Sequence, residues 1–99
     1  MHSRVWRLQY RLATDLERTT LQEYAQLDQR ATTSCRQKLA DLTRQSVVDI
    51  EARPDDADAI SREYQSEMEA TAQQCADIHD QIASGREHAI DRIRTFKYM

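Results

Sequence analysis

Glycine and proline are almost absent from this chain, with one of each in 99 residues. Tight turns and β-hairpins depend on these two residue types, so their scarcity disfavours a fold of several short strands. Aromatic residues are also few, at 6%. No apolar run approaches the ~18 residues that a membrane-spanning helix requires, so we expect no membrane span.

Good helix formers are abundant instead, chiefly glutamine, alanine, arginine, glutamate and leucine. The hydrophobic share of 39% is below the roughly 45–50% of ordinary globular chains. The composition therefore predicts an all-α protein with long helices, organised as a single domain over residues 1–99. Such a chain buries only a thin apolar seam, which a disulfide or self-association would reinforce.

The two cysteines indicate how these helices are arranged. Cys35 and Cys75 are equidistant along the chain from residue 55, which lies in Pro54-Asp55-Asp56 beside the only proline. A turn over residues 52–56 would place them opposite each other in an antiparallel two-helix hairpin. Small residues at 31–34 and 70–72 would allow the close approach that a disulfide needs. We therefore predict a Cys35–Cys75 disulfide.

Apolar or small residues recur at helical spacing on both sides of this turn. Helix one is expected from about Ser3 to Glu51, and Asp55 or Asp56 is expected to cap helix two. The predicted stripe of helix one contains Val5, Leu8, Leu12, Leu16, Thr20, Tyr24, Leu27, Ala31, Cys35, Leu39, Leu42 and Ser46. That of helix two contains Ile60, Tyr64, Met68, Thr71 or Ala72, Cys75, Ile78 or His79, Ile82, Ala89, Ile93 and Phe96. Folding at the turn pairs Leu42 with Met68 and Leu16 with Ile93.

Two features of this pattern leave alternatives open. Ser84-Gly85-Arg86-Glu87 resembles a capping box around the only glycine, so helix two is expected either to kink there or to break into a third helix. Other apolar residues fall off the predicted seam: Leu21, Val47, Val48 and Ile90. Pairing of two hairpins into a four-helix bundle would bury them, which favours a homodimer over a monomer, while half of a heteromeric bundle stays open as an alternative.

Charge separates the two ends of the predicted hairpin. Residues 41–69, around the turn, contain nine acidic residues and three arginines, whereas residues 1–18 and 86–99 each contain four Lys/Arg against two acids. The terminal segments also hold four of the aromatic residues. We predict that this basic end binds a protein partner, using Arg4, Trp6, Arg7, Tyr10, Arg11, Arg92, Arg94, Phe96 and Tyr98. In the alternative interpretation the aromatic rings cover the hairpin's own core.

Other chemistries receive less support from the sequence. The formal net charge of −3 disfavours direct nucleic-acid binding. A metal site at Cys35, Cys75 and His79 is an alternative that requires reduced thiols, but it has neither a CxxC pair nor a clear fourth ligand. Phosphate-binding, HExxH, GxSxG and ExxH motifs are missing. We therefore expect neither an enzyme nor a cofactor.

The segment Pro54-Asp55-Asp56 followed by Tyr64-Gln65-Ser66 resembles the turn and second-helix start of type III secretion needle subunits. Trp6 and Phe96 are similar in placement to aromatic residues of those small hairpins. The chain departs from the family where Ala57 replaces a second proline, in its spacing to Tyr64 and in its paired cysteines. The resemblance implies a small secretion-associated or assembly protein and no particular site residue.

The leading hypothesis is thus a non-enzymatic adaptor, small chaperone or assembly subunit that docks proteins through its basic end. One alternative is a phage- or mobile-element-type regulator that acts on a nucleic-acid-binding machine, for instance by acidic mimicry. Another is a Cys/His metal-binding helical protein. No secretory signal is visible, so the expected location is cytoplasmic, or exported without a classical signal peptide.

Overall fold

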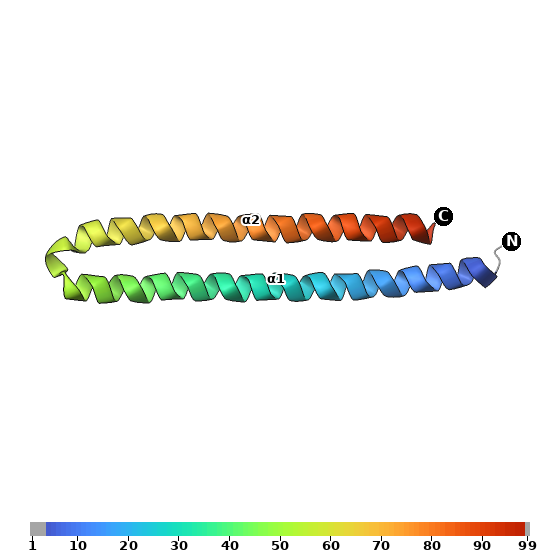
Figure 1. Cartoon of the computed structure of the whole chain (residues 1–99), viewed down its shortest axis with the longest axis horizontal. Coiled ribbons are helices and arrows are strands. Elements are labelled where there is room, and N and C mark those ends of the chain that lie inside the picture. The colour runs from blue at the N-terminus through green and yellow to red at the C-terminus, as the bar shows by residue number, and fades with distance from the viewer. Residues whose placement is uncertain (1–3, 99) are drawn as a thin grey trace. The chain divides into compact units, whose positions relative to one another are not determined.

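Two helices joined by one short turn form the chain in a computed structural model, which describes residues 4–98 (Figure 1). Helix α1 spans Arg4–Ala52, the 3₁₀ turn η1 spans Pro54–Asp56, and helix α2 spans Ala57–Lys97. The helices are antiparallel and pack against each other, so the predicted all-α hairpin is confirmed. The predicted start of helix one at Ser3 lies outside the described residues.

The chain reverses direction at its only proline. A residue that precedes proline is pushed out of the helical region, and Arg53 accordingly has φ −138° and ψ 68°. The Arg53 amide still donates to the Asp49 carbonyl at 3.0 Å, and the Asp56 amide donates to the Arg53 carbonyl at 3.0 Å. Asp55 and Asp56 lie in η1, directly before the first residue of α2, so the predicted N-cap position at Asp56 adjoins the helix.

The hairpin consists of two compact units, each built from parts of both helices. The terminal unit comprises the described residues of Met1–Gln29 and Asp80–Met99, and the turn unit comprises Arg30–His79. In the turn unit Cys35 and Cys75 form a disulfide with an S–S distance of 2.06 Å and a Cα–Cα distance of 6.0 Å, which confirms the predicted cross-link. Ile60 is buried there, and the Tyr64 hydroxyl donates to Asp49 Oδ2.

The seam of the terminal unit differs from the predicted one. Its buried apolar residues are Ala13 and Ile90, and Gln9 Nε2 donates to the Phe96 carbonyl oxygen at 2.6 Å. Ile90 was expected off the seam and is only 7% exposed, so that expectation is wrong. Four residues of helix one that were expected to contact helix two are instead exposed: Val5 (71%), Leu8 (65%), Leu12 (54%) and Leu16 (44%).

This difference has a physical cause. Gln9, Ala13 and Glu17 recur at helical spacing one residue away from the expected stripe. Gln9 and Glu17 both find partners on α2, and Ala13 is small enough to be enclosed completely. Because these polar groups are satisfied in the seam, the neighbouring leucine-rich stripe is left on the surface.

Helix α2 runs without a break through Gly85, so the predicted alternative of a third helix is not observed in the described residues. A Cβ atom at Gly85 would lie 3.3 Å from both Cε1 and the hydroxyl oxygen of Tyr24. The glycine therefore lets the Tyr24 ring of α1 pack directly on the α2 backbone. Its role is close helix packing and not helix termination.

Candidate protein-docking surface

The predicted partner-binding residues all lie in the terminal unit, on the first turns of α1, on the last turns of α2 and, for Tyr98, directly after α2. Three of them, Arg4, Arg7 and Arg11, line one shallow hollow on α1 together with Leu8. All three arginines are exposed. Within residues 4–98 no carboxylate pairs with them. Their positive charges are therefore available to an acidic partner.

The aromatic residues of this end mostly contact one another. The Trp6 and Tyr10 rings stack with centroids 5.3 Å apart, and the Tyr10 and Tyr98 rings meet edge to face at 6.4 Å. Lys97 Nζ lies 4.6 Å from the Tyr10 centroid and 5.8 Å from that of Tyr98. Tyr98 keeps 69% of its surface exposed and Phe96 keeps 38%. Tyr10 is also 38% exposed, so the rings contact one another and still present apolar surface to solvent.

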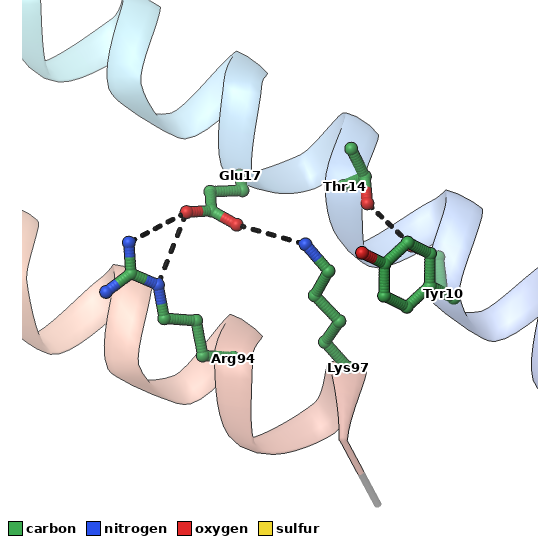
Figure 2. A network of polar contacts seen from close by, with 5 residues as sticks. All are labelled: Tyr10, Thr14, Glu17, Arg94 and Lys97. Atoms are coloured by element: carbon green, nitrogen blue, oxygen red, sulfur yellow. Dashed lines mark hydrogen bonds and ion pairs between the residues drawn. The ribbon is translucent and has the colours of Figure 1, made fainter.

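Arg94, another predicted binding residue, forms an ion pair with the other helix. Figure 2 shows the Glu17 carboxylate of α1 between Arg94 and Lys97 of α2. Glu17 Oε1 accepts hydrogen bonds from Arg94 Nε at 3.3 Å and Nη2 at 3.1 Å, while Oε2 lies 3.7 Å from Lys97 Nζ. Arg92 and Arg94 are both exposed. Arg94 therefore contributes to helix pairing as well as to the basic surface.

Lys97 was not among the predicted residues, although it is 9% exposed and the described chain buries no other charged residue. The ammonium group is enclosed by the Tyr10 and Tyr98 rings and by Glu17, which together replace water around the charge. Its position four residues after Ile93 on the seam of α2 was the available signal. Spacing predicts its burial, whereas residue type argues against it.

The exposed residues Val5, Leu8, Leu12 and Leu16 form a second feature of the terminal unit, which we call the outer stripe. They recur at steps of three and four, so they share one face of α1 over about three helical turns. Leu8 belongs both to this stripe and to the arginine hollow. The hollow and the stripe are therefore adjacent, and a partner could use charge and apolar contacts together.

The cysteine and histidine residues of the alternative metal site lie in the turn unit. Cys35 and Cys75 are bonded to each other, so neither offers a thiolate. The His79 Nε2 atom lies 3.4 Å from the Thr32 hydroxyl oxygen. Among the residues that the structure describes, no group of three His, Cys, Asp or Glu side chains is arranged to hold a metal ion. The oxidised protein thus lacks the predicted three-ligand set.

No protein-family model, curated protein or solved structure matches this chain significantly. As described, neither α1 nor α2 contains a stretch that is long and apolar enough to cross a membrane.

Proposed function

We propose that this chain is a non-enzymatic interaction module, an adaptor, small chaperone or assembly subunit, that docks protein partners through its basic end. The observation that carries the proposal is the gathering of Arg4, Arg7 and Arg11 around the exposed side chain of Leu8. Guanidinium groups beside an apolar anchor suit an acidic protein surface, since arginine pairs with carboxylates and also tolerates partial burial. The rings of Phe96 and Tyr98 add contact area nearby.

A homodimer is part of this proposal. Among residues 4–98 the buried apolar side chains are only Ala13, Ile60 and Ile90. In the same part of the chain, twelve large hydrophobic residues are at least 38% exposed. Association with a second protein surface would remove part of this apolar area from water. The Cys35–Cys75 disulfide favours an oxidising setting for the assembled protein.

The docking surface can be tested by charge reversal. Changing Arg4, Arg7 and Arg11 to Glu is expected to abolish capture of protein partners from an extract of the source cells, while the circular dichroism spectrum keeps its helical form. The matched control reverses three basic residues of the turn unit that are also exposed, Arg30, Arg36 and Lys38, and should retain capture. Calorimetry with the purified partner would then establish direct binding. Equal loss in both variants would show that net charge matters and this surface does not.

A further set of variants in the same capture assay separates the regulator hypothesis from the docking hypothesis. Acidic mimicry would use the exposed carboxylates of residues 41–69. Reversal of those charges, and not of Arg4, Arg7 and Arg11, would then abolish binding, and added DNA or RNA would compete for the partner.

A further inference from the structure

The outer stripe faces solvent over its whole length. Its four residues are all at least 44% exposed, whereas the buried apolar residues of the same unit are Ala13 and Ile90 within the described chain. At a rise of 1.5 Å per residue, Val5 and Leu16 are separated by roughly 17 Å along the helix. A row of this length, with apolar residues at steps of three and four, is the surface that one helix presents to another.

Arginine side chains follow one side of this stripe. Arg4, Arg7 and Arg11 are spaced by three and four residues, so they lie one after another along α1. The hollow that they line together with Leu8 has a volume of about 230 Å³, which is room for an aliphatic side chain between the arginine stems. Such a stem packs against apolar groups while its guanidinium group binds a carboxylate. The surface therefore suits a ligand that carries apolar and acidic side chains about one helical turn apart.

Helix α2 borders the stripe on its other side. Gln9 lies four residues after Val5 and three before Leu12, so it adjoins the stripe on α1. Its Nε2 atom donates to the Phe96 carbonyl oxygen at 2.6 Å, which places Phe96 next to the stripe. Phe96 is 38% exposed, and Arg92, one turn earlier on α2, is exposed as well. A helix that lies on the stripe is therefore within reach of further apolar surface and of another arginine.

The segment that carries the stripe does not supply the acids that these arginines would bind. The acidic residue of segment 4–16 is Asp15, which pairs with Arg18 at 2.8 Å. A second stripe from another copy would bring the same arginines and no further acid, so complementary charge has to come from a different protein. The net charge of −3 disfavours an anionic membrane as the occupant, because such a surface repels the chain as a whole. These observations favour an acidic protein segment.

We propose that the outer stripe receives an acidic amphipathic helix of another protein. The apolar residues of that helix, spaced by three and four, pack on the stripe, and its carboxylates pair with Arg4, Arg7 and Arg11. This inference rests on the proposed docking function and names the element of the partner that the surface recognises. Exposed apolar residues outside the stripe, such as Leu21 and Leu27, stay available for the homodimer.

A synthetic peptide of about three heptads is the probe, with leucine at positions a and d, glutamate at e and g, and alanine elsewhere. Fluorescence anisotropy of the labelled peptide should show micromolar binding to the full, oxidised chain, and this binding should weaken as salt is raised. Circular dichroism of the mixture should show a gain of helix. The same peptide with lysine in place of glutamate, or with one central proline, should bind about tenfold more weakly or worse.

Variants of the chain test the apolar contact. Leu12→Gln with Leu16→Gln should weaken peptide binding by about tenfold or more. Glutamine is a good helix former, so the hairpin should persist. Leu21→Gln is the matched control and should leave the affinity unchanged, because Leu21 is 45% exposed on the same helix but lines a different hollow, together with Ile90 and Arg94.

A charge exchange tests the ion pairs directly. Arg7→Glu with Arg11→Glu should weaken binding of the glutamate peptide and strengthen binding of the lysine peptide, because opposite charges then face each other again. No binding of the glutamate peptide to the wild type at about 1 mM would overturn the inference. Binding that survives the changes at Leu12 and Leu16 would overturn it as well. Adsorption of the chain to phosphatidylserine vesicles in place of peptide binding would instead assign the stripe to a membrane surface.

The capture experiment separates these results from the proposed function. If reversal of Arg4, Arg7 and Arg11 abolishes partner capture while the glutamate peptide fails to bind, the docking function stands and the partner does not present a helix of this kind. If capture survives the reversal, the docking function is wrong and this inference fails with it.

Discussion

The Tyr64 hydroxyl of α2 donates a hydrogen bond to the Asp49 carboxylate of α1, across the seam of the turn unit. Asp49 also accepts a hydrogen bond from Gln45 at 3.0 Å. The bond to Asp49 raises the pKa of Tyr64 to about 12. The pKa of Asp49 is lowered below its usual 3.8, chiefly by the hydrogen bond from Tyr64 and to a smaller extent by the one from Gln45. The Tyr64–Asp49 hydrogen bond thus makes the packing of the two helices depend on the ionisation of both side chains.

These shifts predict how stability depends on pH. The raised pKa of Tyr64 stabilises the fold below its ordinary value of 10.0, and this contribution is lost as the pH rises toward about 12. The lowered pKa of Asp49 stabilises the fold above 3.8, and this contribution is lost as the pH falls through its folded value. Tyr64→Phe should remove the alkaline effect and reduce the acid one, as measured by thermal unfolding across pH. An unchanged pH profile in the variant would contradict the assignment.

Reduction of the disulfide should destabilise the hairpin strongly. The cross-link joins residues separated by 40 positions, and closing a loop of that size contributes about 4 kcal/mol on the chain-entropy model. Cys35→Ser with Cys75→Ser should lower the free energy of unfolding by a similar amount in denaturant titrations at fixed protein concentration. Reductant should then have no further effect on the variant, although it lowers the stability of the wild type. Equal stability of wild type and variant would show that packing alone fixes the pairing.

Glu17 is expected to matter more than other acidic residues of α1. Its carboxylate is 19% exposed and pairs with both Arg94 and Lys97, so Glu17→Gln should cost about 1.5–3 kcal/mol, as for other hydrogen bonds to charged groups. Asp15→Asn is the matched control, because the Asp15–Arg18 pair is exposed on both sides and such pairs contribute less than ~1 kcal/mol. Chemical denaturation of both variants makes the comparison. Equal losses would indicate that the enclosure of Lys97 adds nothing.

Gly85 should tolerate no large side chain. Because even a Cβ atom there would meet the Tyr24 ring at 3.3 Å, Gly85→Leu is expected to destabilise the hairpin by about 1–3 kcal/mol through overpacking. Ser84→Leu, at the exposed neighbouring position, should stay within about 0.5 kcal/mol of the wild type. Thermal unfolding of the pair would reveal the difference. If Gly85→Leu is as stable as Ser84→Leu, the Tyr24 ring moves aside without cost.

The hairpin turn and the disulfide were the features predicted best from the sequence, because the residues that indicate them allow only one physical interpretation. A lone proline equidistant from two cysteines allows few folds other than a hairpin cross-linked at Cys35 and Cys75, and the structure has both. Contacts far from the cysteines obey the same pairing, including Tyr64 with Asp49 and Arg94 with Glu17. The continuous α2 was harder to predict, since the role of Gly85 depends on the Tyr24 ring of the other helix.

Hydrophobicity failed to predict the seam of the terminal unit. Leu12 and Leu16 were assigned to it because apolar residues are usually enclosed, but the satisfied polar side chains of Gln9 and Glu17 occupy the seam instead. The enclosure of Lys97 was missed for the same reason. Pairing partners on another helix decide whether a polar residue can be buried, and spacing along one helix does not contain that information.

The small number of enclosed apolar side chains has a calorimetric consequence. Unfolding raises the heat capacity chiefly by exposing apolar surface to water, and Ala13, Ile60 and Ile90 provide little of it. A lone hairpin should therefore have a heat capacity increment well below the usual ~12–15 cal/mol/K per residue. Its stability curve would then be flat, so cooling would weaken the fold far less than it weakens a protein with a large core.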